Sequence, residues 1–276
     1  MRKHHKILSL IYKFLNFFLK KNENQFRVIM YHDVQTKDLQ NFKNQLIELK
    51  KKWKFIKPEE LDIFSKTKST ITGKNILLTF DDGYKSMLNV NKILNELEIS
   101  AIFFVISDFV NLSKRDNPTN FVHKNIDPGI SPNQIYENLN WKDLQYLLEE
   151  GHTIGAHTKS HKRLTDINDI ELLKEEIINS SIEIEKKLNI KVKHFAYSYG
   201  DINSFNQKSF NIAKSKFEYI FSGVRGNNSN LRFDKNIIRR DSIEPSFTIN
   251  LINFFLEGFI DFKYNMENQK LDKWTN

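Results

Sequence analysis

The stretch NILLTFDDG, residues 75–83, joins an apolar run to two adjacent carboxylates. The run Ile76–Leu78 indicates a buried β-strand, and Asp81 and Asp82 follow where this strand ends. Gly83 permits a sharp turn directly after them. Adjacent carboxylates repel each other unless a cation or a proton lies between them. The stretch therefore predicts a cation site at a strand end or, in the plainer interpretation, a helix N-cap with a solvated neighbour.

Short apolar runs alternate with amphipathic stretches through most of the chain, which favours an α/β fold with a largely parallel sheet. About seven such units can close into a barrel, in which the reactive groups lie at the carboxyl ends of the strands. Residues 108–140 break the alternation, so we expect an inserted loop over one face. Strands are expected at Arg27–Tyr31, Asn75–Phe80, Ser100–Ile106, Thr153–Ala156, Val192–Tyr197, Tyr219–Ser222 and Ile237–Arg240. Helices are expected at Leu39–Lys52, Leu61–Ser65, Tyr84–Leu97, Trp141–Glu150, Asp169–Leu188, Ser204–Ser215 and Phe247–Phe262.

Two histidines, His157 and His161, follow another predicted strand end. A helical turn at this point would place both imidazoles on one face, where they can hold one cation. The alternative is two unrelated surface histidines. Because the two aspartates and the two histidines both follow strands of one sheet, they are expected at the same rim of the barrel. Two histidines and one carboxylate form a known type of catalytic metal site.

Two further strand ends carry polar groups. Phe195–Asp201 follows a late strand, and its plainer interpretation is a capped strand-to-helix turn. Met30–Asp33 ends the first strand. His32 in this segment is either a turn histidine or, given its place on the rim, a proton donor.

The composition limits the chemistry. The 276 residues are 39% apolar, which excludes a disordered chain. Without cysteine there is no disulfide, thiolate zinc site or cysteine nucleophile. Any metal must be held by aspartate, glutamate or the eight histidines.

The formal net charge of +8 is concentrated at the start of the chain. Residues 1–21 hold six of the 42 basic residues and no acidic residue, so the rest is nearly neutral and a nucleic-acid-binding face is not supported. Polar residues spaced by three and four, among them Lys6, Lys13 and Asn16, predict an amphipathic helix that lies on an anionic membrane surface. The alternative is a helix packed on the domain.

The apolar run in this segment is too short for a helix that spans a membrane. Lys13 and Asn16 interrupt its apolar core and no small-x-small cleavage site follows, so we expect no cleavable signal peptide. The expected location is cytoplasmic or peripheral at the membrane.

Thr79–Gly83, His157–His161 and Phe195–Gly200, in this order, resemble the first three motifs of the polysaccharide deacetylase family. This is the NodB-homology domain, also called carbohydrate esterase family 4. The resemblance covers residues 26–262, with 1–21 as a basic amphipathic helix before it and 263–276 as a C-terminal tail. Met30–Asp33 resembles the branch whose catalytic histidine motif is permuted to the front, as in exopolysaccharide poly-N-acetylglucosamine deacetylases.

The resemblance implies a distorted (β/α)7-type barrel. It implies that Asp82, His157 and His161 bind one divalent metal, most often zinc, with cobalt or nickel as alternatives. The implied activity is removal of N-acetyl groups from amino sugars of a bacterial-type surface glycan or its precursor. The implied partner is an N-acetylated saccharide or glycolipid.

The resemblance also implies three catalytic roles. Asp81 is the expected general base, and His32 is the general acid in the permuted arrangement. The backbone N–H of Tyr199 is expected to stabilise the oxyanion. Protonation of the departing nitrogen is needed because an amide anion is a very poor leaving group.

Several positions depart from the family pattern. Ala196 stands where an arginine commonly orients the base, Ser198 stands where proline is usual, and no Leu-x-His motif is found near the C-terminus. Asp81 therefore needs another partner. Arg240 or Arg239 is our hypothesis, and only one of the two should point inward if that stretch is extended.

Three other functions remain open on the sequence. A deformylase or deacetylase of a lipid-linked monosaccharide would use the same site, and the amphipathic helix favours it. A non-catalytic glycan-binding member would keep only the fold, although the retention of Asp81 argues against it. A membrane-tethered scaffold with a structural metal would need a fourth protein ligand, and the motifs contain three.

Overall fold

A computed structural model describes residues 3–18, 23–67, 71–129, 134–233 and 235–275. Its centre is one sheet whose paired strands are all parallel, in the order β8-β7-β6-β5-β4-β3-β1-β9, with β2 paired to β3. The strands are β1 (Gln25–Tyr31), β2 (Lys54–Phe55), β3 (Lys74–Phe80), β4 (Ala101–Val105), β5 (Thr153–Ala156), β6 (His194–Ala196), β7 (Tyr219–Phe221), β8 (Ile237–Ile238) and β9 (Asp241–Ser242).

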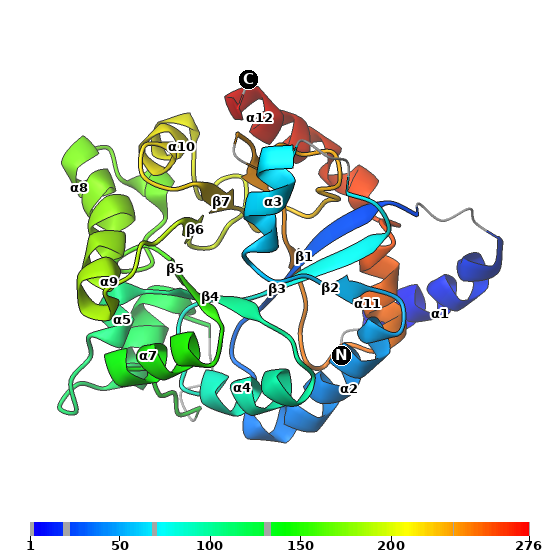
Figure 1. The fold of residues 1–276 in the computed structure, drawn as a ribbon, viewed down its shortest axis with the longest axis horizontal. Helices are drawn as coiled ribbons and strands as arrows, with labels where there is room; N and C mark the ends of the chain where they lie inside the picture. Colours follow the sequence, from blue (N-terminus) through cyan, green and yellow to red (C-terminus); the bar gives the residue numbers. More distant parts are fainter. Residues whose placement is uncertain (1–2, 19–22, 68–70, 130–133, 234, 276) are drawn as a thin grey trace.

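Helices form a ring around the curled sheet (Figure 1). This arrangement is the expected distorted (β/α) barrel, preceded by a helix. The helices are α1 (Lys3–Phe18), α2 (Leu39–Lys50), α3 (Glu60–Thr67), α4 (Met87–Glu96), α5 (Ser107–Val110), α6 (Pro118–Phe121), α7 (Trp141–Glu149), α8 (Ile170–Lys174), α9 (Ser180–Leu188), α10 (Gln207–Lys214), α11 (Ile249–Leu256) and α12 (Asn265–Thr275). Short 3-10 turns lie at Thr36–Asp38, Leu164–Asp166 and Asp261–Tyr264, and π turns at Val122–Ile126 and Glu175–Asn179.

The alternation of side chains along each strand divides the apolar residues into two layers. On β1, Phe26 and Val28 belong to a cluster inside the barrel, whereas Ile29 and Tyr31 pack between the sheet and the helices. Helix α3 adds Leu61 to the inner cluster. Beyond β8 the same alternation places Arg240 on the inner side, two residues after Ile238 of the inner cluster.

Every strand expected from the sequence is present. The expected helix Phe247–Phe262 ends early, as α11, before the 3-10 turn Asp261–Tyr264, and two other expected elements are divided. The expected helix Asp169–Leu188 is interrupted by the π turn Glu175–Asn179, between α8 and α9. The expected strand Ile237–Arg240 pairs with β7 only as far as Ile238, and the chain then pairs with β1 from Asp241. The segment 237–242 therefore runs from one edge of the sheet to the other and closes the barrel.

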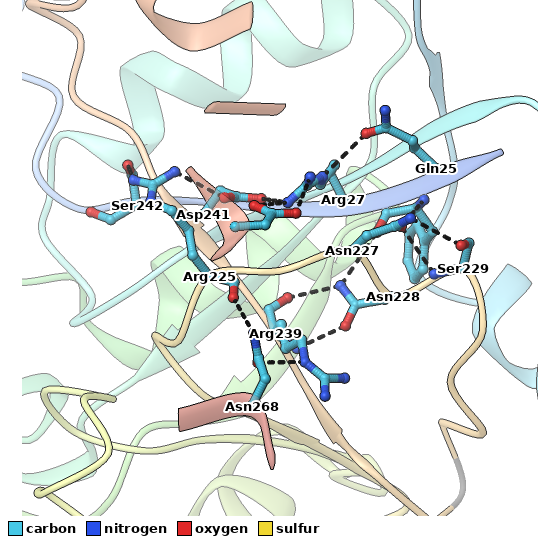
Figure 2. Close-up of polar contacts among 12 residues, drawn as sticks. Gln25, Arg27, Arg225, Asn227, Asn228, Ser229, Arg239, Asp241, Ser242 and Asn268 are labelled. Atoms are coloured by element: carbon cyan, nitrogen blue, oxygen red, sulfur yellow. Dashed lines mark hydrogen bonds and ion pairs between the residues drawn. The ribbon is translucent and has the colours of Figure 1, made fainter. Parts of the chain in front are cut away.

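At this closure, which we call the seam, the side chain of Asn228 adds to the β1–β9 ladder (Figure 2). Its amide donates to the carbonyl of Arg239 at 2.9 Å and accepts from the Arg239 N–H at 2.9 Å. The Asn228 backbone N–H donates to the carbonyl of Phe26 on β1, also at 2.9 Å. An amide side chain has one donor group and one acceptor, as a peptide does, so Asn228 replaces a strand neighbour at this point.

A buried ionic cluster lies beside the seam, on the outer side of β1. The guanidinium of Arg27 donates to both carboxylate oxygens of Asp261, at 3.1 and 2.6 Å, and lies 3.5 Å from Asp241. Asp241 also accepts from Arg225 at 2.9 Å, so this buried carboxylate lies between two arginines (Figure 2). Charges removed from water need such partners, because an unpaired buried ion is strongly destabilising.

Helix α1 packs on the barrel through one of its sides. The His5 ring lies 4.9 Å from that of Phe247, the hydroxyls of Ser9 and Thr248 are 3.2 Å apart, and Tyr12 is buried. Helix α11 separates α1 from the rest of the barrel (Figure 1). The packed side includes Ser9, which lies three residues after Lys6 and four before Lys13 and so belongs to the predicted polar stripe.

The opposite side of α1 is apolar and open to solvent. Ile7, Leu10 and Ile11 are 57%, 65% and 40% exposed, and Lys6 beside them is exposed. Within the described residues, none of the helices combines the length and the apolar character needed to cross a bilayer.

The segment expected as a C-terminal tail contains helix α12. Leu271 of this helix is buried in the main cluster, and the ring of Trp274 lies 5.5 Å from that of Phe205. Arg239 also donates to Asn268 and Asp272 of α12, at 2.6 and 2.7 Å. The helix therefore covers the outer side of the seam.

Replacement of Arg27 by methionine tests the ionic cluster. The variant leaves Asp241 and Asp261 without the guanidinium they share, and we expect the free energy of unfolding to fall by about 3–5 kcal/mol. Urea denaturation followed by circular dichroism measures this loss. Asp261→Asn is the control, because this carboxylate is 26% exposed and its loss leaves Asp241 paired with both arginines. Equal losses in the two variants would contradict the importance of the buried carboxylate.

Candidate functional site

Asp82, His157 and His161 meet at the carboxyl-terminal rim of the barrel. Asp82 follows β3 and the histidines follow β5, and all three residues are buried. Asp82 Oδ1 lies 3.5 Å from His157 Nε2 and 3.6 Å from His161 Nε2. One donor atom from each residue falls within 4.8 Å of the others. The structure thus brings together two strand ends that are 75 residues apart in the sequence.

Backbone carbonyls orient both imidazoles. His157 Nδ1 lies 2.9 Å from the carbonyl oxygen of Ala196, and His161 Nδ1 lies 2.9 Å from that of Asn125. A carbonyl oxygen only accepts, so each Nδ1 carries a hydrogen, and in the neutral imidazole each Nε2 then has a free lone pair. Donation from the second ring nitrogen is the usual support of a metal-binding histidine. Both lone pairs therefore lie on the side of Asp82.

The carboxylate of Asp82 has no hydrogen-bond partner among the described residues, although both of its oxygens are buried. A buried carboxylate without a partner is costly, and a cation removes that cost. One carboxylate and two neutral imidazoles suit a divalent transition metal such as zinc. The residues at this position therefore fit the metal that the family resemblance implies.

The histidine loop, residues 157–161, is not helical. The helical turn considered from the sequence does not form, because Thr158 and His161 have φ of +63° and interrupt any regular turn. The Thr158 hydroxyl oxygen accepts from the His161 N–H at 3.1 Å and stabilises the bend. Asp82 and Tyr199, with φ of +77° and +61°, share this rare left-handed conformation. Strained backbone of this kind concentrates at functional sites.

Glu176 holds the histidine loop from behind. It lies in the π turn Glu175–Asn179, where the sequence predicted an uninterrupted helix. One of its oxygens accepts from the backbone N–H groups of Lys159 and Ser160, at 3.2 and 2.9 Å, and the other accepts from the Ser160 hydroxyl at 2.5 Å. The buried carboxylate of Glu176 thus accepts the hydrogen bonds that the loop between the two histidines donates.

Asp81 forms a two-pronged ion pair with Arg240. The guanidinium donates to both carboxylate oxygens, at 2.7 and 2.8 Å, and both side chains are buried. Burial by itself raises the pKa of Asp81, but Arg240 and His157 outweigh it and lower the pKa below its ordinary value. Arg239 points to the other side of the segment, toward Asp272. Only one of the two arginines therefore points inward.

Two positions that depart from the family pattern lie close to this ion pair and the histidine loop. Ala196 belongs to the inner cluster, as does Phe104, and the Arg240 guanidinium lies 5.3 Å from the Phe104 ring. The guanidinium in the barrel interior therefore comes from Arg240 of the segment 237–242, and not from position 196 on β6. The Ser198 hydroxyl donates to the carbonyl of Lys162 at 2.5 Å, beside His161.

A cleft of about 750 Å³ opens above these residues. Asp81, Asp82, His157, His161 and His32 all line it. His32 is exposed in the cleft, on the loop that follows β1. Another wall is formed by five residues of the segment expected as an inserted loop: Ile126, Asp127, Pro128, Gln134 and Tyr136. Every residue that the sequence singled out for catalysis or metal binding is thus in or against one cleft, with Arg240 beneath it.

Tyr199 forms part of the wall next to His161. Its ring lies 4.6 Å from that imidazole, its hydroxyl donates to the Asn125 carbonyl at 3.2 Å, and the Arg163 guanidinium covers its ring at 4.3 Å. No backbone partner of its N–H is found among the described residues.

Three supports of the site were not found from the sequence: Glu176 and the carbonyls of Asn125 and Ala196. A backbone carbonyl carries no residue-type signal, so no pattern could have identified the last two. The single available signal for Glu176 was an acidic residue on the inward face of a predicted amphipathic helix.

Solved structures of deacetylases have the same fold. IcaB from Ammonifex degensii matches with a TM-score of 0.68 and 20% identity, over 86% of this chain and 99% of that chain. Deacetylase PplD from Streptococcus pyogenes, in complex with acetate, matches with a TM-score of 0.64 and 19% identity, over 85% of this chain and 99% of that chain. A de-N-acetylase from Aggregatibacter actinomycetemcomitans matches with a TM-score of 0.64 and 18% identity, over 84% of this chain and 100% of that chain.

The search of curated proteins found no match. The family model for polysaccharide deacetylase matches residues 68–216, which include Asp81, Asp82, His157, His161 and Tyr199. This range is more than half of the chain. The chain therefore belongs to the polysaccharide deacetylase family, whose members are hydrolases that act on amide bonds.

Proposed function

We propose that the protein is a metal-dependent N-deacetylase that removes acetyl groups from amino sugars of a surface glycan or its precursor. The observation that carries this proposal is the meeting of His157, His161 and the unpartnered Asp82 beside a second carboxylate in one cleft. Three protein ligands leave open positions for water and substrate, as in catalytic metal sites.

In this proposal Asp82, His157 and His161 hold one divalent ion, with zinc as the expected metal. When bound, such an ion supplies Lewis acidity that polarises a carbonyl and makes water more acidic. The two carbonyl-bound imidazoles and the strained loop hold the ligand atoms in place before the metal arrives.

The chain's own groups then divide the proton transfers. Asp81, fixed by Arg240, accepts the proton of the attacking water. The free N–H of Tyr199 donates to the oxygen on which negative charge develops. His32, exposed in the same cleft, donates a proton to the departing nitrogen, so that the amine and acetate leave.

We also propose that α1 holds the enzyme on an anionic membrane surface. The apolar surface of Ile7, Leu10 and Ile11 faces solvent, and six basic residues lie in 1–21 without an acid. An exposed apolar strip with basic neighbours suits the headgroup region of an anionic bilayer.

Asparagine at position 81 tests the general base. Asp81→Asn keeps the proposed ligands, so we expect unchanged Co²⁺ binding and a loss of acetate release of about 10²–10⁴-fold. The substrates are N-acetylated free sugars, oligosaccharides and lipid-linked sugars, and Co²⁺ binding is followed by visible absorption. Asp82→Asn is the matched control and should lose both properties. Activity of Asp81→Asn near that of the unchanged protein refutes the role, and absence of acetate release from every substrate refutes the function.

The neighbouring arginines provide a second test. Arg240→Met removes the only ion-pair partner found for Asp81 among the arginines and lysines described, and we expect kcat to fall by about 10²-fold or more while KM changes little. Arg239→Met removes a contact to the partly exposed Asp272 and should leave kcat within a few-fold. Acetate release measures both effects, and thermal melting separates unfolded protein from inactive protein. A similar kcat in both variants would contradict the orienting role of Arg240.

Vesicle flotation tests the membrane proposal. The triple variant Ile7→Ser, Leu10→Ser, Ile11→Ser removes apolar surface that contributes nothing to the core, so the fold should remain. We expect the unchanged protein to float with phosphatidylglycerol vesicles and the triple variant to lose at least about tenfold of that binding. Ile63→Ser, at an equally exposed position on α3, is the control. Equal flotation of the triple variant and the control would refute the proposal.

A further inference from the structure

The buried side-chain amide of Gln45 joins two segments that line the cleft. Gln45 belongs to α2, and its side chain is almost inaccessible to water. Its amide oxygen accepts a hydrogen bond from the Tyr31 hydroxyl at 2.8 Å. Its NH2 group donates to the carbonyl oxygens of Glu244, Pro245 and Phe247, at 3.1, 3.0 and 2.8 Å. One side chain thus connects the end of β1 to the segment that follows β9.

The segment 244–247 belongs to neither a helix nor a strand, and α2 bonds three of its carbonyl groups. The amide of Asn41, one turn before Gln45 on α2, also donates to the Pro245 carbonyl. Backbone carbonyl groups that leave the solvent need hydrogen-bond donors, and irregular backbone has few of its own. The course of this segment therefore depends on the amide donors of α2.

Both ends of this connection reach the cleft. His32 directly follows Tyr31, and Glu244 is the first residue that Gln45 holds on the other side. The side chains of His32 and Glu244 both line the cleft, whereas Gln45 does not. The strands that lead to them, β1 and β9, are neighbours in the sheet. Gln45 therefore fixes two neighbouring strand ends relative to each other from behind the cleft wall.

Tyr31 connects Gln45 to both proposed proton-transfer groups. The Tyr31 carbonyl accepts a hydrogen bond from the Asp81 N–H at 3.0 Å, and the next residue in the chain is His32. The side chain of Tyr31 is fully buried, and its hydroxyl is held by the Gln45 amide. The distance between the base and the acid along the rim therefore depends on where Tyr31 lies.

We propose that Gln45 is a positioning residue for the acid step: through Tyr31 it holds His32 where its proton reaches the departing nitrogen. This inference rests on the proposed function and adds to it a residue outside the cleft. Proton transfer needs hydrogen-bond distance, so a displacement of about 1 Å removes much of the effect of an acid. Because Arg240 holds Asp81 separately, loss of Gln45 should impair the acid more than the base.

The leaving group of the substrate separates the two proton transfers. An amide needs protonation of its nitrogen, whereas 4-nitrophenyl acetate expels a stable phenolate without an acid. The amide probes are N-acetylglucosamine oligomers with β-1,4 or β-1,6 linkages. We expect Gln45→Leu to lower the ratio of kcat for the amide to kcat for the ester by about tenfold or more, while KM changes little.

A double-variant cycle shows whether Gln45 acts through the acid. His32→Ala should lower the same ratio, and Gln45→Leu in that background should lower it no further, because residues that act through one group are not additive. Equal losses of kcat on the amide and the ester in Gln45→Leu would overturn the proposal. Additive losses of the ratio in the double variant would also overturn it.

Two variants separate this effect from a loss of stability. Tyr31→Phe keeps the buried ring and removes only the hydroxyl, so we expect a smaller fall of the ratio. Asn91 of α4 is another buried amide, 2.6 Å from His152 Nε2, at the amino end of β4. Asn91→Leu should leave the ratio unchanged, and thermal melting shows whether each variant is folded. A fall in Asn91→Leu as large as that in Gln45→Leu would overturn the proposal.

A crystal structure of Gln45→Leu tests the positioning role without any activity. We expect displacement of His32 and of the segment 244–247, with the three candidate metal ligands in their original places. An undisplaced His32 would overturn the proposal. Absence of acetate release by the unchanged protein would refute the proposed function, and displacement of His32 in this structure would still support Gln45 as the residue that positions it.

Discussion

The buried ion pair between Arg240 and Asp81 connects the last part of the barrel to the end of β3, where the candidate site begins. A charge pair without water is tolerated only where its geometry is good and its other groups are bonded. Both conditions hold here, because Arg240 Nε also donates to the Ser222 carbonyl at 2.8 Å. The position of Asp81 therefore depends on how the segment 237–242 crosses from β8 to β9, and the catalytic rim depends on closure of the barrel.

The sequence predicted the strands and the residues of the cleft far better than it predicted what supports them. Asp81, Asp82 and His157 were found because a pair of acids and a histidine follow apolar runs, and these are local signals. The π turns, the Asn228 seam and the bend at His161 arise from contacts between distant segments, which no single-sequence pattern reports. Arg240 is intermediate: alternation predicted that one of two arginines points inward, and only the packing identified which one.

Both π turns lie next to the histidines. The turn Val122–Ile126 presents the Asn125 carbonyl to His161, and the turn Glu175–Asn179 presents Glu176 to the histidine loop. A π turn widens a helix by one residue and is frequent at functional sites. Two elements that would be ordinary helical turns in a simpler barrel are here adapted to hold strained backbone in place.

The Asn228 seam has a consequence for motion. At the seam the segment 237–242 pairs with two residues of β7 and then with two of β1, and the Asn228 amide bonds to Arg239 between these two short ladders. Local opening begins where the fewest cooperative bonds must break. Transient opening of these short ladders at the seam would draw Arg240 away from Asp81. The fold would lose the Arg240–Asp81 contact well before it loses its core.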